Sequence, residues 1–233
     1  NNKTKKYRYF IKSHKRKLMD NLSEKIKQLR NEYSDSDFLI EHLDKNPVKQ
    51  FTKWLDDAIE TKIYEPNAMV LATSVDDQPR SRYVLFKNIV EDKLIFHTHY
   101  ESPKALEMLA NPNISGIFYC AEIHRQVRFQ GIAKKADKTI SDEYFSTRPR
   151  GGQLSAWASD QSSIIQNREE VTNKIAELDK KFENQEVPRP DFWGGFEIEV
   201  NYWEFWQGRR NRTHDRFCYT QNTQGWNIER MSP

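Results

Sequence analysis

The residues best suited to bind or transform a ligand are cations placed at regular intervals. Arg212, His214 and Arg216 alternate along the chain, so an extended strand would put all three on one face. Such groups repel one another unless an anionic or electron-rich ligand fills the space between them. The aromatic residues between Trp203 and Trp206 favour a ligand site here over the alternative, a solvated basic edge.

Two further groups of cations suit phosphate. Tyr144 and Arg148 are four residues apart, which places them on one helix face, where a phenol and a guanidinium can share a phosphate. The alternative is an ordinary exposed helix end. Arg82 and Lys87 are five residues apart, so a regular strand would point them in opposite directions. If both serve one site, the strand bulges or the two side chains reach different parts of the ligand. The pattern predicts one or two phosphorylated ligands.

Other common site chemistries are absent from the sequence. There is no GxGxxG, GxxxxGK[ST], HExxH or GxSxG motif. Of the six histidines only His97 and His99 have a close spacing, and a pair without a third ligand is usually structural, so no metal site is predicted. Cys120 and Cys218 form no CxxC motif and are interpreted as buried thiols of a protein in the reducing cytoplasm.

The scaffold that must position these cations is predicted to be mainly β with peripheral helices. β-Branched and aromatic segments with short connections indicate antiparallel strands at Ala68 to Val75, Ser81 to Val90, Lys93 to Thr98, Ile114 to Cys120, Gln126 to Lys134, Gly195 to Phe205, Asp215 to Thr220 and Trp226 to Arg230. Helices are expected from Pro47, after Ser102, at about 139–146 and at about 163–184. Together these elements predict an antiparallel barrel of six to eight strands.

The N-terminal region has a different composition from the rest. Residues 1–30 hold 11 Lys and Arg side chains against Asp20 and Glu24, a net charge of +9, whereas the whole chain of 233 residues carries +3. A helical stripe recurs from Leu18 to Tyr33. Aromatic residues among these charges could suit nucleic acid, but a solvated arm is the favoured interpretation, and no nucleic-acid partner is expected. No run of 18 apolar residues occurs, so no membrane partner is expected either.

Several ordered blocks of this sequence resemble one enzyme family. They are RYVLFK at 82–87, HRQV at 124–127, YFSTRPR at 144–150, QLSAW at 153–157, QSS at 161–163, FWGGF at 192–196, EFWQG at 204–208, RTHDRF at 212–217 and RMSP at 230–233. In this order they resemble the FMN-dependent pyridoxine/pyridoxamine 5′-phosphate oxidase family, from about residue 28 to residue 233. Many separate blocks in order are far more specific than any single one.

The resemblance implies an antiparallel split β-barrel that binds FMN and works as a cytoplasmic homodimer, with FMN at the subunit interface. It implies an oxidase domain over residues 28–233 and a basic arm over residues 1–27, partly disordered or helical. The implied reaction, in vitamin B6 metabolism, converts pyridoxine 5′-phosphate and pyridoxamine 5′-phosphate to pyridoxal 5′-phosphate. O2 would be the acceptor, giving hydrogen peroxide, with ammonia released from the amine. The alternatives are a related split-barrel flavin enzyme with another substrate and a non-catalytic module that binds pyridoxal phosphate.

The resemblance also assigns residues. The implied FMN contacts are Arg82, Tyr83, Val84, Leu85, Phe86, Lys87, the backbone of His97, Thr98, Lys104, Gln126, Gln161, Ser162, Trp206 and Arg216. The implied substrate contacts are Lys87, Tyr144, Arg148, Arg212, His214, Arg30 and Tyr33, with Arg212 and His214 as the catalytic pair that holds the pyridine ring. The chain departs from the family pattern at Pro103, where the family has a basic residue, and at Gly152, where it has Ser.

Overall fold

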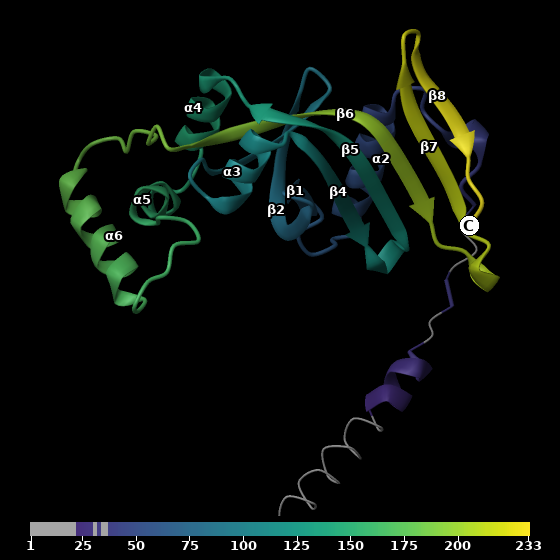
Figure 1. The fold of residues 1–233 in the computed structure, drawn as a ribbon, viewed down its shortest axis with the longest axis horizontal. Helices are drawn as coiled ribbons and strands as arrows, with labels where there is room; N and C mark the ends of the chain where they lie inside the picture. The colour runs from purple at the N-terminus through teal and green to yellow at the C-terminus, as the bar shows by residue number, and fades with distance from the viewer. Residues whose placement is uncertain (1–21, 30–31, 34–36) are drawn as a thin grey trace, which may run out of the picture.

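One antiparallel sheet of eight strands forms the body of the molecule (Figure 1). The computed structural model describes residues 22–29, 32–33 and 37–233. Strand order is β3-β2-β1-β4-β5-β6-β7-β8, and an additional pairing of β3 with β6 closes the first six strands into a barrel. The predicted antiparallel barrel with helices around it is therefore confirmed. The strands are β1 (Ala68–Val75), β2 (Gln78–Val90), β3 (Lys93–His99), β4 (Asn113–Cys120), β5 (Arg125–Lys135), β6 (Trp193–Gln207), β7 (Asp215–Asn222) and β8 (Gly225–Arg230).

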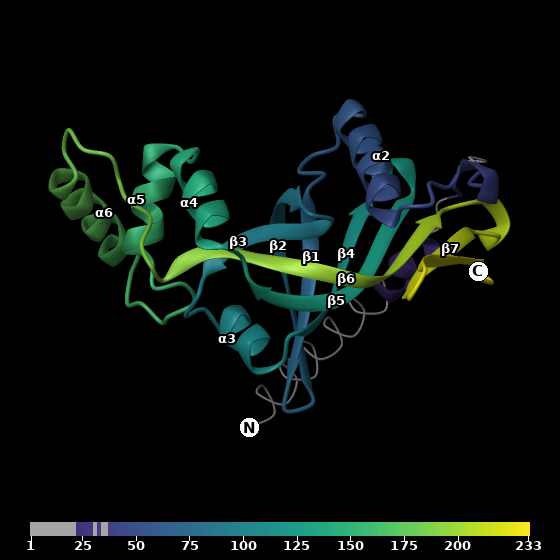
Figure 2. The same cartoon turned by 90° about the horizontal axis from the view of Figure 1, so that it is seen from above.

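Helices surround the barrel at both ends (Figures 1 and 2). They are α2 (Pro47–Glu60), α3 (Pro103–Ala110), α4 (Lys138–Ser146), α5 (Arg150–Ala158) and α6 (Glu169–Lys181), with short 3-10 turns η1 (Ile40–His42), η2 (Ala121–Ile123) and η3 (Arg210–Arg212). None of the described helices is long and apolar enough to cross a bilayer.

Tight turns in this glycine-poor chain are made by acidic residues. The β1–β2 hairpin turns at Asp76 and Asp77, with φ of 52° and 58°, and the β2–β3 hairpin turns at Glu91 and Asp92, with φ of 49° and 61°. Two successive left-handed residues match the twist of the flanking strands. These turns bring the three strands into register without glycine.

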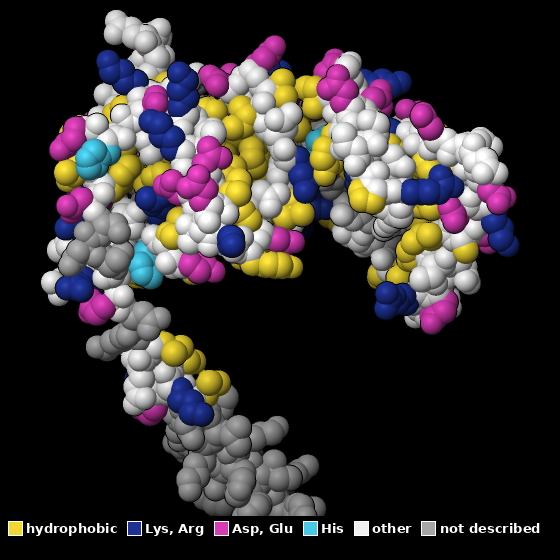
Figure 3. Space-filling view, turned by 180° about the vertical axis from the view of Figure 1, so that it is seen from behind, with side chains coloured by type: hydrophobic (Ala, Val, Ile, Leu, Met, Phe, Trp, Pro, Cys, Tyr) yellow, Lys and Arg dark blue, Asp and Glu magenta, His cyan; other side chains and the backbone are white. Residues whose placement is uncertain are grey.

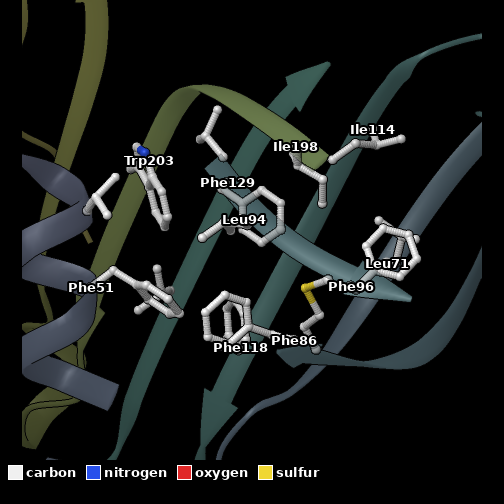
Figure 4. Packing of buried hydrophobic residues seen from close by; sticks show 14 of the residues in the cluster. Phe51, Leu71, Phe86, Leu94, Phe96, Ile114, Phe118, Phe129, Ile198 and Trp203 are labelled. Carbon is white, nitrogen blue, oxygen red and sulfur yellow. The ribbon is translucent and has the colours of Figure 1, made fainter. Parts of the chain in front are cut away.

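The main core lies inside the barrel and is mostly aromatic. Phe51 of α2 packs against Phe118 and Trp203, with ring centroids 4.8 Å and 5.5 Å apart, and Phe129 lies on the far side of both (Figure 4). The α2 helix is predicted correctly by its start signal: the side chain of Asn46 accepts hydrogen bonds from the first-turn N–H groups, and Pro47 follows it.

The lobe of α4, α5 and α6 has its own small core, and here the sequence prediction is partly wrong. The core is formed by Phe145, Leu154, Phe182, Val187 and Trp193, among others. The α5 helix is missed because Gly151 and Gly152, which indicate a turn, lie in its first turn. The α6 helix begins at Glu169 rather than near 163, with acids in its first turn and lysines in its last, as the helix dipole favours.

Before α2, the described residues show where the chain joins the barrel. Phe38 is buried against Trp54 and Phe217, with ring centroids 4.7 Å and 5.2 Å apart. Residues 22–28 are helical, in line with the predicted stripe, and their apolar side chains are exposed. Arg30 and residues 1–21 lie outside the described residues, so the boundary between arm and domain stays a prediction.

Candidate functional site

Strand β6 connects two groups of candidate site residues that lie at its opposite ends. We call the α4 end the group of Lys87, His97, Tyr144, Arg148 and Trp193, and the β7 end the group of Tyr33, Trp206, Arg212, His214 and Arg216. In Figures 1 and 2, β6 runs from the α4–α5 lobe at one side of the molecule to β7 at the other. Figure 3 shows a notch between the barrel and this lobe, with Lys and Arg side chains at its edge.

A third group, the α3 cluster, lies where α3 covers the end of β1 and β2. It consists of Arg80, Arg82, Thr98, Lys104, Glu107 and Gln161. The Nζ of Lys104 donates to the Thr98 hydroxyl at 3.2 Å and to the Gln161 Oε1 at 3.0 Å. Burial, reinforced by the charge of Arg82, lowers the pKa of Lys104 to about 8. A buried ammonium held by neutral oxygens fits an incoming phosphate.

Glu107 organises the arginines of the α3 cluster. Its carboxylate accepts from Arg82 at 2.7 Å and from the Thr73 hydroxyl at 2.5 Å. Although burial opposes its ionisation, the hydrogen bonds from Thr73 and Arg82 hold the pKa of Glu107 below its usual value. The cluster thus gathers predicted FMN contacts from β2, β3, α3 and the segment after α5.

At the α4 end, His97 lies in a stack of rings. Its centroid is 4.0 Å from that of Tyr144 and 5.3 Å from that of Trp193, and the rings are nearly parallel. Burial, together with the charges of Arg148 and Lys87, lowers the pKa of His97 to about 4. Among the described residues, neither ring nitrogen forms a hydrogen bond of good geometry, and the nearby backbone of Ile140 only partly offsets the lowering of the pKa. The imidazole is therefore neutral, in a strongly positive surrounding.

Arg148 is the last member of the α4 end, and it lies beyond the end of α4 rather than within the helix. It lies two residues beyond Ser146, the last residue of α4, so the shared helix face predicted for Tyr144 and Arg148 is wrong in detail. Its guanidinium lies 4.7 Å from the ring of Trp193 and donates to the Gly152 carbonyl at 2.8 Å. A Cβ at Gly152 would come within 3.3 Å of this guanidinium, so the glycine leaves room for it.

Lys87 faces the α4 end because of an irregularity in β2. The β2–β3 register shifts between Phe86 and Asn88, which is the bulge that the sequence left open. The charge of Lys87 acts on His97, whereas Arg82 bonds to Glu107 in the α3 cluster. His97, at the α4 end, and Thr98, in the α3 cluster, are consecutive on β3 and therefore point to opposite faces of the sheet. Lys87 lies on the face of His97 and Arg82 on the face of Thr98, so the two cations belong to different clusters.

At the β7 end, Tyr33 packs edge-on against three rings. Its centroid lies 4.9 Å from His124, 5.3 Å from His214 and 5.7 Å from Trp206. A Cβ at Gly208 would come within 2.8 Å of the Tyr33 ring, so the glycine makes this close approach possible. A cavity beside these rings is lined by Leu29, Glu32, Tyr33, Tyr119, Ala121, His124, Asn211 and Arg212.

Arg212 and His214 lie in a turn, which corrects the extended strand considered for residues 212–216. Arg212 ends η3 with a φ of 59°, and β7 begins only at Asp215. The Nδ1 of His214 accepts a hydrogen bond from the backbone N–H of Arg209 at 3.0 Å. Burial and the charge of Arg212 lower the pKa of His214.

Arg216 lies on β7 opposite Trp206, and Trp206 lies opposite Gln126 on β5. The Nε and Nη2 of Arg216 donate to one oxygen of Glu204 at 3.0 Å and 2.8 Å, and Arg128 donates to the other oxygen at 2.8 Å. Sequence reasoning missed both Glu204 and Glu107. Glu204 could have been found from the sequence, because it is an acid within an aromatic strand. A buried acid requires cations nearby, so this position predicts ion pairs.

The remaining predicted FMN contacts are distributed along β2 and after α5. Tyr83 and Leu85 are exposed, Val84 is half-buried and Phe86 belongs to the core. Ser162 adopts a left-handed conformation, with a φ of 72°, directly after Gln161.

The predicted substrate contacts are not all brought together in one chain. Gly195, opposite His97, and Trp206, opposite Arg216, are separated by 11 residues of β6. At about 3.3 Å per residue, this is roughly 35 Å of strand. Lys87, Tyr144 and Arg148 therefore lie far from Tyr33, Arg212 and His214 within one protomer.

Comparison with known families finds two matches along the chain. A family model described as pyridoxamine 5′-phosphate oxidase matches residues 55–182. A second, described as the pyridoxine 5′-phosphate oxidase C-terminal dimerisation region, matches residues 193–233, which include β6 to β8.

Among curated proteins, the chain is similar to enzymes named pyridoxine/pyridoxamine 5′-phosphate oxidase. It is 45% identical to the protein from Rubrobacter xylanophilus, over 88% of this chain and 95% of the relative. It is 42% identical to the protein from Acaryochloris marina, over 93% of this chain and 99% of the relative.

Among solved structures, the chain resembles PhzG from Burkholderia lata in complex with tetrahydrophenazine-1-carboxylic acid. The TM-score is 0.80 at 27% identity, and the match covers 86% of this chain and 100% of that one. An FMN-binding, pyridoxamine 5′-phosphate oxidase-related protein from Nostoc punctiforme shares the fold, with a TM-score of 0.65 at 16% identity over 82% of this chain and 99% of that one.

Proposed function

The chain belongs to the pyridoxine/pyridoxamine 5′-phosphate oxidase family, and we propose that it oxidises pyridoxine 5′-phosphate and pyridoxamine 5′-phosphate to pyridoxal 5′-phosphate. FMN is the proposed cofactor and O2 the proposed acceptor. Hydrogen peroxide is the second product, and the amine substrate also releases ammonia.

The observation that carries the proposal is the presence of two separate cation groups suited to phosphate. In the α3 cluster, Arg82 and Lys104 lie beside the Thr98 and Gln161 side chains. At the α4 end, Lys87 and Arg148 both act on His97. A phosphorylated cofactor and a phosphorylated substrate need two such groups. The α3 cluster fits the FMN phosphate, and the α4 end, with Tyr144, fits the substrate phosphate.

A homodimer is the proposed working form. The phosphate-binding residues of the α4 end and the ring-binding residues of the β7 end lie at opposite ends of β6, so a second protomer is needed to bring them to one substrate. The match of residues 193–233 to a dimerisation region supports this arrangement. FMN would then lie at the interface.

The β7 end would hold the substrate ring in a defined orientation. When bound, FMN would supply the two-electron redox chemistry that oxidises the substrate at C4′, with O2 as the final electron acceptor. Because the Nδ1 of His214 accepts from Arg209, the neutral imidazole carries its proton on Nε2. His214 therefore offers a donor to the substrate ring and serves orientation rather than proton abstraction.

Arg212 and Tyr33 add to this orientation from two directions. Arg212 brings a cation to the cavity, and the ring of Tyr33 lies over His214 and Trp206. Holding a substrate in one reactive geometry contributes a large part of the rate enhancement in such reactions.

A visible spectrum of the purified protein tests the proposal. We expect a yellow protein whose flavin band is bleached by pyridoxine 5′-phosphate without oxygen and returns when air is admitted. A colourless protein that cannot be loaded with FMN would contradict the proposal. Normal FMN loading without turnover of either B6 phosphate would point instead to another substrate, as the phenazine complex of the structural relative illustrates.

A further inference from the structure

The α3 cluster contains an arginine that the proposed function does not use. We propose that Arg80 is a further ligand of the cofactor phosphate, held at the site by Glu107. This inference rests on the proposed FMN site in the α3 cluster.

The first support is geometric. Arg80 and Arg82 are two residues apart on β2, so they project from the same face of the strand. The two oxygens of Glu107 are divided between them: Arg80 Nη1 lies 3.3 Å from Oε1, and Arg82 Nη2 lies 2.7 Å from Oε2. The two guanidinium groups are thus fixed side by side.

The second support is that Arg80 keeps its donors available. Its side chain is 53% exposed, against 21% for Arg82, so it lies at the open rim of the cluster. Among the described residues its guanidinium makes one hydrogen bond, to Glu107. A guanidinium has five N–H donors in a fork that matches phosphate oxygens.

The third support is the charge balance of the cluster. Arg82 and Lys104 with Glu107 carry a net charge of +1, and Arg80 raises it to +2. A phosphate monoester carries nearly two negative charges near pH 7. An acid inside a phosphate site would by itself repel the ligand. Its presence is understandable if Glu107 serves to hold two arginines while the cluster still matches a dianion.

A similar arrangement elsewhere shows what is particular to Glu107. The buried Glu197 also holds two cations, Lys93 at 3.1 Å and Lys134 at 3.0 Å. Beside Glu107, the charges of both Glu107 and Arg82 act on a third cation, Lys104, whose ammonium is held by Thr98 and Gln161. The charges that act on Glu197 are those of Lys93 and Lys134. Lys134 is 61% exposed, close to the value for Arg80, and is therefore a matched control.

Titration of the FMN-free full-length protein with FMN and with riboflavin tests the inference, because the two flavins differ only in the phosphate. We expect Arg80→Gln to weaken FMN binding about tenfold and to change riboflavin binding less than twofold. Arg80→Lys, which keeps the charge without the fork, is expected to weaken FMN binding about threefold. Lys134→Gln is expected to leave both affinities unchanged.

Two results would overturn the role of Arg80. One is an Arg80→Gln protein that keeps the wild-type preference for FMN over riboflavin, and the other is an equal loss of both flavins. If thermal denaturation shows that Arg80→Gln does not fold, Arg80→Lys takes its place. An Arg80→Lys protein that keeps the wild-type preference for FMN over riboflavin would likewise overturn the role of Arg80. A wild-type protein that binds both flavins equally would refute the proposed phosphate site itself, and the role of Arg80 with it.

Discussion

The α4 end and the β7 end both combine cations with aromatic rings, yet they treat charge in opposite ways. Among the described residues, neither Lys87 nor Arg148 forms an ion pair. At the β7 end, Arg216 is bound to Glu204, and next to this group Arg209 and Arg230 are bound to Asp215. Arg212 is the exception there, since it has no ion pair within the described part of the chain.

This difference indicates what each end is built to hold. A cation without a carboxylate keeps its charge for an anion. At the α4 end, burial and then the charges of Arg148 and Lys87 lower the pKa of His97, so the two cations act on the same site. An arginine already bound to a carboxylate has most of its charge balanced, so it offers a ligand hydrogen bonds from a fixed position rather than net charge. We therefore associate the α4 end with the phosphate of the substrate and the β7 end with its ring.

The largest expected effect comes from removing one cation at each end. Arg148→Ala should lower kcat/KM for pyridoxine 5′-phosphate about 100-fold, because a charge-assisted contact to phosphate is lost. Steady-state kinetics with pyridoxine, which lacks the phosphate, should show a much smaller change. Arg212→Ala should lower activity with both substrates and leave FMN bound.

The paired design carries its own control. Equal losses for phosphorylated and unphosphorylated substrates in Arg148→Ala would contradict the assignment of the α4 end to phosphate. Loss of FMN from Arg212→Ala would mean that the β7 end has been wrongly assigned.

The next effect concerns stability at the β7 end. Glu204→Gln should lower the free energy of unfolding by about 2 kcal/mol, because Arg128 and Arg216 lose the buried carboxylate that both contact. Thermal denaturation should show this as a fall of about 5 °C in Tm. Glu91→Gln, which removes an acid that is 81% exposed beside Lys93, should change Tm by less than about 1 °C. Equal effects would show that the Glu204 pairs are not stabilising.

A smaller effect concerns pH and the α3 cluster. The pKa of Lys104 is about 8 in the protein without ligand, and a bound phosphate favours the protonated ammonium. FMN binding therefore takes up a proton above pH 8, and its affinity should fall about tenfold between pH 7.5 and 9.5. Fluorescence titration of wild type and Lys104→Met checks this, since the variant should bind more weakly with a flatter pH profile. A wild-type affinity constant over this range would contradict it.

The smallest effect is expected at His97. Because its pKa is about 4, the imidazole is neutral over the range of the assay, and its main contact is the stack with Tyr144. His97→Phe should change kcat/KM less than about threefold and leave the pH profile between 5.5 and 8.5 unaltered, which steady-state kinetics will measure. Disappearance of an ionisation from the profile would refute this.

The sequence predicted all eight strands and the separate cation groups, because both depend on local spacing. It missed α5, where Gly151 and Gly152 suggested a turn but tertiary packing of Leu154 favours helix. It also missed Glu107 and Glu204. Glu107 acquires its role from Arg82, 25 residues away, which the packing of α3 against the sheet brings near. Glu204 acquires its role from Arg128, 76 residues away, which lies opposite it in the pairing of β5 with β6. The separation of the two ends likewise depends on β6 being a continuous strand of 15 residues.

The position of β6 in the sheet also affects how the chain folds. It pairs with β3, β5 and β7, and its contacts with β3 join residues about 100 positions apart, such as Leu94 and Ile198. During synthesis β1 to β5 emerge first, and until β6 arrives both β3 and β5 are open edges. Such edges recruit strands from other chains, and such long-range pairing is slow to form. The strand that separates the two ends of the site is thus also the one whose late arrival leaves two edges of the nascent sheet open to other chains.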